Sequence, residues 1–396
     1  MSGCPRHSQF DPLAPETFDS PYALYADLQA QCPVAWSEGW GGFWALTRYE
    51  DVAAVAAQHD TYITSIQNVI PKVAFTGRRP PLHLDPPDHT PYRRALNPLL
   101  SERRVAKLEP VVRRHCAELI APLVAAGAGE ICSDFSSRLP ILVFAEWMNL
   151  PPAEVLTLAE TGRVYNLAVQ ANQDDVVKES SLALYQMARD LVVRRKAEPM
   201  DPLDDATSAL LAARVDGQAL PEEMIVGTIR QVLVVGIIAP TVLFGSIVVH
   251  LARDQALQSA LRDDPSRIPA AVEEFLRLYT PYRGFARTAN RDVEIGGEVI
   301  AKDEPIALVY AAANRDPSVF HNPDQFDADR PNIGDHIAFG RGAHHCPGAH
   351  LARLQMRIAL EELLVRTSRF TLDGEPKQTR FPEIGAMAVP IALSPA

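Results

Sequence analysis

Near its C-terminal end, the chain reads FGRGAHHCPGAHLAR from Phe339 to Arg353. This segment is a glycine-rich loop that delivers one cysteine, Cys346, and a pattern typical of a helix follows it. A cysteine at a helix N-terminus is favoured as a thiolate, because the helix dipole attracts an anion and backbone N–H groups can point at the sulfur. Pro347 has no N–H, so we expect Gly348 and its neighbours to be the donors. The segment therefore presents a thiolate that is suited to binding a metal.

Two interpretations of Cys346 are open at this point. A lone cysteine after a loop is commonly a buried structural residue, but a single thiolate is also one of the few ways in which proteins bind haem iron. The surrounding residues favour the second interpretation, since Phe339, Gly342, Cys346 and Gly348 fit the spacing Phe-x-x-Gly-x-x-x-Cys-x-Gly. That spacing resembles the haem-binding loop of the cytochrome P-450 family. A c-type haem attachment is not expected, because no Cys-x-x-Cys-His motif occurs.

Composition limits the class of protein. The chain has 396 residues, of which 47% are hydrophobic, so it can bury a large core. Its net charge of −11 argues against non-specific binding to nucleic acid. The five cysteines are scattered and odd in number, so no disulfide framework is expected and a reducing compartment fits. No linker, charge block or repeat divides the chain, which predicts one domain over residues 1–396.

One segment passes a simple test for a membrane span. Residues Val232–Val249 carry no charge over eighteen positions, which reaches the length of a transmembrane candidate. The segment lies in the middle of the chain and contains Gly236 and Pro240, and a helix that is apolar all round is equally typical of the centre of a large protein. The N-terminus has no apolar stretch that would serve as a signal or anchor. We therefore expect a cytoplasmic protein without a membrane partner.

Apolar periodicity predicts a chain that is mainly α with small β-sheets, and the resemblance implies the cytochrome P-450 fold. The predicted helices are Tyr22–Gln31, Tyr49–Gln58, Thr90–Leu99, Arg104–Ala126, Ile141–Asn149, Pro152–Asn172, Asp175–Glu198, Pro221–Asp254, Gln255–Asp263, Ala270–Leu278 and His350–Arg366. No Gly-x-Gly-x-x-Gly motif follows a strand, so a built-in flavin or nicotinamide domain is not expected.

The resemblance assigns roles around the expected cofactor, haem b. Cys346 would be the iron ligand, and Phe339 would pack on the thiolate side. The basic residues that would bind the haem propionates are His89, Arg93, Arg287 and His344. Any of these four taken alone is also compatible with a solvated basic residue, and the motifs that surround them favour the haem role.

A second implied feature is a structural ion-pair triad of Glu274, Arg277 and Arg330. Glu274 and Arg277 are three residues apart, so they share one helix face and can pair. An isolated Glu-x-x-Arg is common and is often an ordinary surface pair of little energetic value. Here it precedes Cys346 at the separation typical of the family, which favours a buried triad that fixes the loop beneath the haem.

The central helix departs from the family pattern. Ile238 and Ala239 stand where most relatives have an acid followed by a threonine that help to deliver protons to dioxygen, and neither can relay a proton. Thr241 lies two residues later, about 200° around the helix, so it is expected to point away. Pro240 cannot donate to the carbonyl of Gly236 and should kink the helix there. We therefore count Gly236, Ile238 and Ala239 as catalytic candidates, with a water at the Gly236 carbonyl as one possible proton route.

The resemblance also places a substrate pocket that is largely apolar, as small-molecule sites usually are. Its expected lining is Ile66, Val69, Ile70, Phe75, Leu167, Val235, Ile238, Ala239, Phe285 and Ile384, together with Arg283. Arg283 is a candidate anchor for a substrate carboxylate, and the alternative is a solvated or internally paired arginine.

The function implied by the resemblance is that of a soluble bacterial haem-thiolate monooxygenase. It would insert one oxygen atom from dioxygen into a small, mostly apolar organic substrate by hydroxylation, dealkylation or epoxidation. Electrons would come from a separate ferredoxin and ferredoxin reductase, and a basic docking face could include Arg103, Arg104, Lys107, Arg113, Arg114, Arg341 and Arg353. The alternatives are a peroxide-dependent peroxygenase, suggested by the missing acid and threonine, and a haem-containing binding or regulatory protein without turnover.

Overall fold

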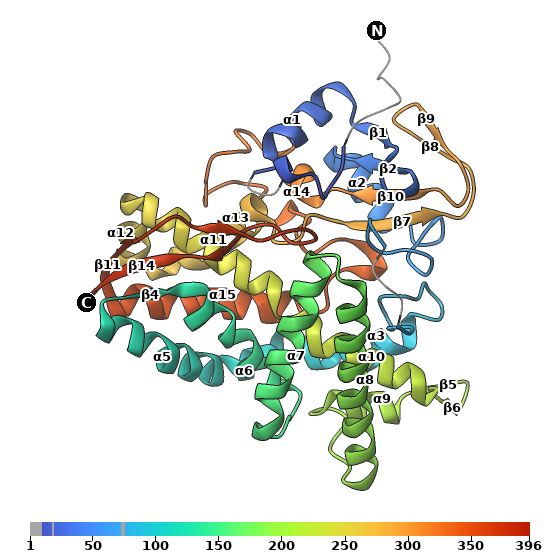
Figure 1. Cartoon of the computed structure of the whole chain (residues 1–396), viewed down its shortest axis with the longest axis horizontal. Coiled ribbons are helices and arrows are strands. Elements are labelled where there is room, and N and C mark those ends of the chain that lie inside the picture. Colours follow the sequence, from blue (N-terminus) through green and yellow to red (C-terminus); the bar gives the residue numbers. More distant parts are fainter. Residues whose placement is uncertain (1–9, 18–19, 73–75) are drawn as a thin grey trace.

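A computed structural model describes residues 10–17, 20–72 and 76–396 of the chain. The molecule is mainly helical, with small sheets, as the periodicity predicts. A sheet and its short helices occupy the end of the molecule near the N-terminus, and the long helices form the rest (Figure 1). The predicted Phe75 lies outside the described residues.

The largest sheet among the described residues has the strand order β1-β2-β10-β7-β3. Strands β2 and β10 are parallel, and the other neighbours are antiparallel. Ile306 lies between Trp44 and Arg287 in the register, so Arg287 stands on the strand next to the central one. The strands are β1 (Val34–Ser37), β2 (Phe43–Leu46), β3 (Tyr62–Ile63), β7 (Phe285–Ala289) and β10 (Pro305–Leu308). The helices near this sheet are α1 (Tyr22–Gln31), α2 (Tyr49–Ala57) and α14 (Tyr310–Ala313).

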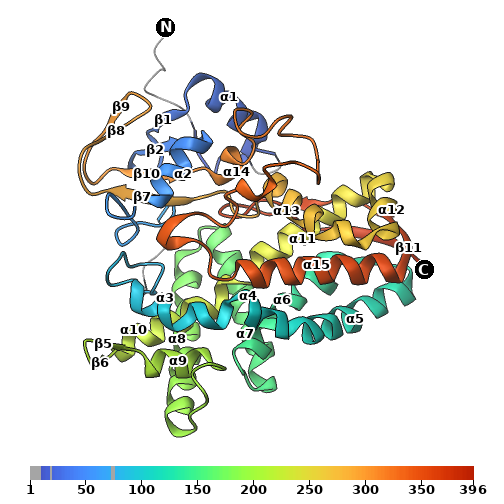
Figure 2. The same ribbon diagram turned by 180° about the vertical axis from the view of Figure 1, so that it is seen from behind.

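The long helices enclose the main apolar core. Helix α15 (Ala349–Arg366) lies against α5 (Glu109–Ala126) on one side and α13 (Ile268–Tyr279) on another, as Figure 2 shows. Helix α11 (Ile238–Arg253) passes behind them and supplies fully buried side chains such as Val242 and Ile247. The remaining helices of this part are α3 (Thr90–Leu96), α4 (Glu102–Val105), α6 (Arg138–Trp147) and α12 (Gln255–Asp263).

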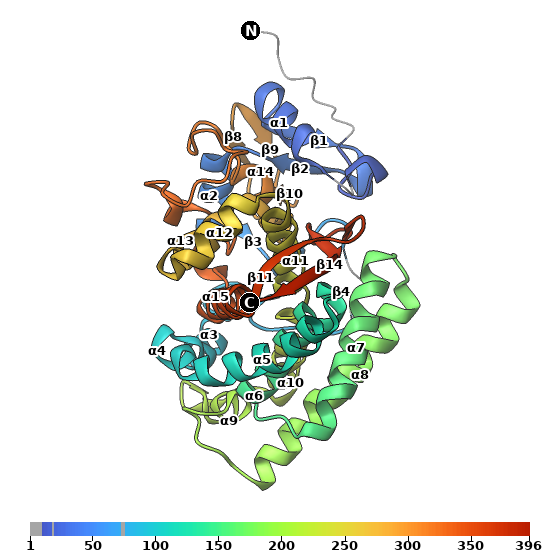
Figure 3. The same cartoon turned by 90° about the vertical axis from the view of Figure 1, so that its left-hand side faces the viewer.

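Helices α7 (Pro152–Gln170) and α8 (Asp174–Ala197) form a long hairpin along one edge of the molecule (Figure 3). Helix α10 (Glu222–Val235) packs against α8 and α7, and α9 (Ala206–Ala212) lies beside it. The smaller strands are β4 (Ala128–Glu130), β5 (Arg214–Val215), β6 (Gln218–Ala219), β8 (Val293–Ile295), β9 (Glu298–Ile300), β11 (Thr367–Leu372), β12 (Lys377–Gln378), β13 (Ala386–Ala388) and β14 (Pro390–Pro395).

The predicted helix Pro221–Asp254 is wrong in one respect, because it is two helices. Helix α10 ends at Val235 and α11 begins at Ile238. Pro240 explains the break, since it has no N–H to donate to the carbonyl of Gly236. The segment Glu222–Arg253 is the one candidate membrane span in the described part of the chain, and most of it is buried inside the molecule. That burial is typical of a core helix.

The cysteines differ from expectation at one position. Cys32 is disulfide-bonded, although no disulfide framework was predicted from the number and scatter of the cysteines. The number and scatter of the cysteines do not reveal a single pairing of this kind. Cys116, Cys132 and Cys346 are free thiols, and the first two are buried in the main core.

Candidate active site

The loop before α15 has a shape that requires its glycines. Gly340 and Gly342 have φ values of 68° and 69°, in the left-handed region that favours glycine. A Cβ atom at Gly342 would lie 2.7 Å from the carbonyl oxygen of Ala56, so the loop packs closely on the end of α2. The N–H of Cys346 donates to the carbonyl of Phe339 at 2.9 Å, which closes the loop. These contacts hold the cysteine just before the start of α15.

Burial and nearby positive charges have opposite effects on the pKa of the Cys346 thiol. Burial raises the pKa of the Cys346 thiol, while the N–H of Gly348 and the guanidinium groups of Arg93 and Arg353 act to lower it. Arg353 lies 4.6 Å from the centroid of the Phe339 ring and bonds both carboxylate oxygens of Glu273, at 2.6 and 2.9 Å. The Phe339 ring therefore packs against the guanidinium group of Arg353, which Glu273 holds in place beside the cysteine loop. A thiolate bound to a metal would benefit from the same donors.

His89 and His344 meet on another side of this space. Their rings are in edge contact, with centroids 4.7 Å apart. Nε2 of His344 lies 3.2 Å from the Thr64 hydroxyl and 3.6 Å from Oδ1 of Asp85. Burial acts to raise the pKa of Asp85, but hydrogen bonds from His344, Thr64 and Ser65 outweigh it and hold the pKa well below its usual value. Asp85 therefore stays anionic and fixes the His344 ring.

His89 carries a buried nitrogen without a partner. Its Nε2 atom makes no hydrogen bond, although the side chain is only 3% exposed. Burial, together with the charges of the neighbouring His344 and Arg93, lowers the pKa of His89 to about 4. A buried polar atom without a partner is uncommon, and it points to a group that the protein binds. An acceptor such as a carboxylate would satisfy it.

Arg93 and Arg287 complete a set of basic side chains. Arg93, on α3, has its pKa lowered by burial and raised by the nearby Cys346. Arg287, on β7, is 3% exposed and donates from Nη1 to the carbonyl of Ala286 at 2.9 Å. Both arginines act electrostatically on His344. The structure thus brings together four basic side chains from three separate parts of the chain around Cys346.

This donor set fits haem b. The thiolate of Cys346 suits the iron, and two arginines and two histidines suit the two propionates. The unpartnered Nε2 of His89 is an observation of this structure that agrees with a missing acceptor. Arginine matches a carboxylate particularly well, since its planar fork can donate two parallel hydrogen bonds.

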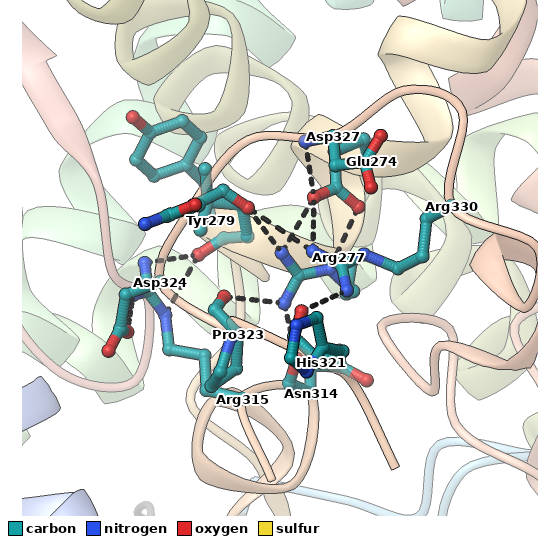
Figure 4. Close-up of polar contacts among 12 residues, drawn as sticks. Glu274, Arg277, Tyr279, Asn314, Arg315, His321, Pro323, Asp324, Asp327 and Arg330 are labelled. Atoms are coloured by element: carbon teal, nitrogen blue, oxygen red, sulfur yellow. Dashed lines mark hydrogen bonds and ion pairs between the residues drawn. The ribbon is translucent and has the colours of Figure 1, made fainter. Parts of the chain in front are cut away.

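The triad residues lie in contact with one another (Figure 4). Nε and Nη2 of Arg277 donate to the two oxygens of Glu274 at 2.8 and 2.7 Å, and Nη2 of Arg330 lies 3.4 Å from Oε1. Glu274 also accepts the N–H of Asp327 at 3.0 Å, and Nη1 of Arg277 donates to the carbonyls of Asn314 and Pro323, both at 2.8 Å. Glu274 and Arg277 are fully buried. These bonds tie α13 to the irregular segment that leads to the cysteine loop.

The residues that follow the break between α10 and α11 differ in their burial and contacts. Ile238 is buried and clusters with Ile237 and Val242, and Ala239 is half-buried. The hydroxyl of Thr241 donates to the carbonyl of Ile237 at 2.8 Å and to that of Ser136 at 3.0 Å. This hydroxyl is therefore already engaged with backbone on the side of residues 132–136.

The predicted pocket residues are not uniformly buried. Val69, Ile70, Ile238 and Ile384 are buried, Phe285 and Ala239 are half-buried, and Ile66, Leu167 and Val235 are exposed. Arg283 is 2% exposed, donates from Nη2 to the carbonyl of Thr17 at 2.8 Å and from Nε to that of Glu383 at 3.2 Å, and so is bonded internally. Its Nη1 atom has no hydrogen-bond partner. This geometry favours the internally paired alternative for Arg283.

Three side chains that converge near the pocket were not predicted: Arg79, Tyr165 and Arg230. Arg230 is fully buried, and its guanidinium lies 4.5 Å from the ring centroid of Tyr165. The signal in the sequence is that Arg230 is the single charged residue between Glu223 and Arg253. A charge within such an apolar stretch indicates a specific role.

Comparisons with known proteins identify the family of this chain. Residues 171–392 match the family model described as Cytochrome P450. Erythromycin C-12 hydroxylase of Saccharopolyspora erythraea is 32% identical over 362 residues, which cover 88% of this chain and 89% of that protein. Mycinamicin IV hydroxylase/epoxidase of Micromonospora griseorubida is 32% identical over 359 residues, which cover 88% of each. The structure of cytochrome P450 CYP109Q5 from Chondromyces apiculatus is similar with a TM-score of 0.88, at 29% identity and 99% coverage of both chains.

The chain therefore belongs to the cytochrome P450 family. It has the cytochrome P450 fold, its cofactor is haem b, and it is a haem-thiolate monooxygenase of the bacterial type.

Proposed function

We propose that this enzyme inserts one oxygen atom from dioxygen into a small, mostly apolar organic substrate, with electrons from a separate ferredoxin and ferredoxin reductase. The observation that carries the proposal is the set of Cys346 and four basic side chains, His89, Arg93, Arg287 and His344, around one space. Bound haem b would supply the activation of dioxygen there. The reaction would be hydroxylation, dealkylation or epoxidation in the cytoplasm.

The residues of the chain would each have a limited task. Cys346 would ligate the iron as a thiolate, which the N–H of Gly348 and the charge of Arg93 stabilise. Glu274, with Arg277 and Arg330, would hold the segment that leads into the cysteine loop. The propionate partners would fix the orientation of the haem plane.

The apolar side chains would keep water from the substrate. Val69, Ile238 and Ile384 are buried and carry no hydrogen-bonding group, as is usual in a site for an apolar ligand. The names of two relatives state that they act on erythromycin and mycinamicin, which are organic molecules with C–H bonds to oxidise. This supports an organic substrate without identifying it.

The break at Gly236 is the proposed route for protons. Ile238 and Ala239 cannot relay a proton, and Thr241 is bonded to backbone carbonyls. Because Pro240 has no N–H, the carbonyl of Gly236 lacks its usual donor four residues on, and it can accept a hydrogen bond from a water. A substrate complex in which this break is straight and dry would overturn this part of the proposal.

The docking face for a ferredoxin is smaller than the sequence suggests. Arg104, Arg113, Arg114 and Arg353 pair with carboxylates of this chain, such as Glu361 with Arg113. Arg341 donates to the hydroxyl of Tyr49 and the carbonyl of Asp335. Within the described residues, Arg103 and Lys107 are exposed and have no ion pair. The proposed face therefore centres on these two residues.

A second candidate is a peroxide-dependent peroxygenase. The observation that favours it is the absence of a proton-relaying side chain at positions 238 and 239, together with the engaged hydroxyl of Thr241. Hydrogen peroxide brings its own protons and electrons, so such a relay is less necessary.

The test begins with a ligand screen that monitors the spin state of the haem. A ligand that shifts the spin state is then incubated with ferredoxin, reductase and NADPH, and separately with hydrogen peroxide. Product in the first mixture alone supports dioxygen-dependent monooxygenation, and product with peroxide alone supports the second candidate. A normal thiolate spectrum with carbon monoxide but no product by either route, over the whole ligand set, would indicate a binding protein and contradict both.

A further inference from the structure

Arg230 on α10 is a buried cation with unused hydrogen-bond donors. Its side chain is 0% exposed, and Nη2 donates to the hydroxyl of Ser181 on α8 at 2.8 Å. Its Nε and Nη1 atoms are buried and have no hydrogen-bond partner among the described residues. The guanidinium lies against the ring of Tyr165 on α7, 4.5 Å from its centroid. A buried charge is costly unless it is paired, so these free donors need an explanation.

A second arginine meets the first at Tyr165. Nη1 of Arg79 donates to the hydroxyl of Tyr165 at 3.3 Å, and Nη2 lies 3.1 Å from Nε2 of His83. Burial and the charges of Arg79 and Arg230 lower the pKa of His83 to about 3, so His83 is neutral and can accept from Arg79. Two guanidinium groups thus share one tyrosine.

The loop that carries Arg79 is held in place by packing. The carbonyl of Arg78 lies so close to α10 that a Cβ atom at Gly227 would be 2.1 Å from it. The same carbonyl accepts the hydroxyl of Tyr185 at 3.2 Å. Gly77, with φ at 153°, passes so close to Tyr185 that a Cβ would lie 2.5 Å from its hydroxyl. The approach of Arg79 to Arg230 is therefore fixed by the backbone.

In the part of the chain that the structure describes, no carboxylate neutralises this pair. Within the described residues, neither Arg79 nor Arg230 forms an ion pair with an aspartate or glutamate. The buried carboxyl of Glu383 accepts from Gln170 at 3.1 Å instead. The pKa of Tyr165 is lowered, because the positive charges of the two arginines outweigh the effect of burial. The cluster has two cations and lacks an anion.

A cavity lies at one side of this cluster, where Arg79 and His83 form part of its lining. This cavity of about 260 Å³ is lined by Arg79 and His83, by Arg78 and Lys72, and by the polar segment from Thr64 to Asn68. Its lining is rich in cations and hydrogen-bond donors. The cavity can therefore admit the charged end of a small molecule.

Two members of the cluster lie on helices that come close to the break in the central helix. Tyr165 is on α7 and Arg230 is on α10. Gly162 on α7 is so close to the break that a Cβ there would lie 3.3 Å from Cδ1 of Ile237. Tyr165 follows one turn later on α7. Arg230 precedes Gly236 by six residues, which is about 9 Å along a helix axis. An anion held at the cluster would thus belong to a molecule that extends toward the break.

From these contacts we infer that Arg79, Arg230 and Tyr165 bind the carboxylate of the substrate, so that the substrate is an organic acid with an apolar body. The inference rests on the proposed function, since it assigns the substrate class of that same site. The free donors of Arg230 and the guanidinium of Arg79 would make charge-assisted hydrogen bonds, which are about twice as strong as neutral ones. Arg283 is not this anchor, because it is bonded to backbone carbonyls.

The test compares acids with their esters on the haem-loaded enzyme. The probes are 4-phenylbutanoate and decanoate, each with its methyl ester, and affinities are measured by difference spectroscopy and by isothermal titration calorimetry. We expect the acids to bind at least about tenfold more tightly than the esters, and this preference to weaken at high salt. The inference is wrong if no acid binds more tightly than its ester.

The variants locate the preference. Arg79→Gln should reduce the affinity for the acids about tenfold and leave the esters within about twofold. Arg163→Gln, at an exposed arginine of α7 that pairs with Glu160 and lies outside the cavity lining, is the matched control and should leave both unchanged. Arg230→Gln and Tyr165→Phe should act like Arg79→Gln, and the carbon monoxide spectrum checks that each variant is folded. An equal loss for acid and ester in Arg79→Gln would assign it a packing role and overturn the inference.

Binding and turnover are read separately. Selective binding of acids without oxidation by either electron route would leave the inference standing and contradict the proposed function. Oxidation of esters as readily as acids, without selective binding, would do the reverse.

Discussion

Glu274 is a single carboxylate between two buried arginines. It bonds Arg277 through both oxygens and Arg330 through one. Replacement by Gln would leave two buried guanidinium groups without a counter-charge, which costs roughly 3–5 kcal/mol. We therefore expect Glu274→Gln to lower the free energy of unfolding by this amount, measured by urea denaturation followed by circular dichroism.

The control for this change lies beside Arg330. Asp329 is exposed and pairs with Arg267 at the surface. Asp329→Asn should change the stability by less than about 0.5 kcal/mol. Equal effects of the two variants would show that burial of the triad does not matter.

Glu383 is a buried carboxyl whose charge is disfavoured. Burial raises its pKa to about 7 from a model-peptide value near 4.5, although Gln170 and Arg283 oppose the rise. The folded protein therefore binds a proton that the unfolded chain has released, and stability falls as the pH rises from about 4.5 to 7. The loss is on the order of 3 kcal/mol at most.

Glu383→Gln removes that titration. We expect the variant to gain stability relative to the parent as the pH rises from 5 to 8, measured as the difference in melting temperature at each pH. Glu375→Gln, at an exposed residue nearby, provides the comparison. A difference between Glu383→Gln and the parent that stays constant over this range would contradict the prediction.

A substitution at Ala239 tests the proposed proton route directly. Ala239→Thr adds a hydroxyl one residue before Pro240, at the position where the resemblance predicts a threonine in most relatives. We expect a larger fraction of NADPH to yield product rather than peroxide, with little change in peroxide-driven turnover. Ile247→Val, in the buried part of α11, controls for a general effect on the helix. An unchanged yield would mean that this position does not limit proton delivery.

The central helix is divided into two elements, and we attribute this division to one residue, Pro240. Pro240 is the third residue of α11, and the chain at Gly236 and Ile237 is not helical. Pro240→Ala restores an N–H that can donate to Gly236, so α10 and α11 should join. We expect slower hydrogen exchange in the peptide that spans residues 232–242.

A second proline serves as the control. Pro152 is the first residue of α7, where a missing N–H costs nothing. Pro152→Ala should leave exchange in its own helix unchanged. If exchange at residues 232–242 is the same in Pro240→Ala and the parent, the break has another cause.

Element boundaries were predicted well where the signals are local. Tyr22–Gln31 is a helix with the predicted bounds, and α7 begins at Pro152 as predicted. The break at Gly236 could be anticipated because a proline acts on a carbonyl four residues away. The extent of the break, which includes Ile237, depends on packing against Ile141 and Met387 from other elements.

The proposed haem site is formed by residues from separate parts of the fold. Arg287 comes from the sheet, Arg93 from α3 and Cys346 from the loop before α15. A ligand that binds all three stabilises the folded state by mass action. Protein expressed without haem should therefore melt several degrees lower than the haem-loaded enzyme, and exchange faster at residues 64–72, 76–93 and 340–346.

Another region should not respond. Helices α5 and α15 are joined by a network in which Arg113 and Arg357 both bond Glu109 and Glu361. Exchange in these helices should be the same with and without haem. A uniform increase over the whole chain would mean that haem is needed for the entire fold.

The nature of the chemistry was readable along the chain, because the signal is local. Cys346, its glycines and the start of the helix after it lie within fifteen consecutive residues, and the predicted departure at Ile238 and Ala239 concerns two adjacent residues. The resemblance of these motifs to the cytochrome P450 family also implied roles for Glu274, Arg277 and Arg330. Adjacent residues keep their spacing in any fold, so their pattern carries over directly.

Other features depended on contacts between distant residues. Arg79 and Arg230 lie about 150 positions apart, and only the packing of Gly227 against the Arg78 carbonyl brings them to one tyrosine. In the same way, Arg283 and most of the expected docking arginines are engaged by partners far away in the chain. Whether a charge is free or paired is a property of the space around it, and that space exists only once the chain has folded.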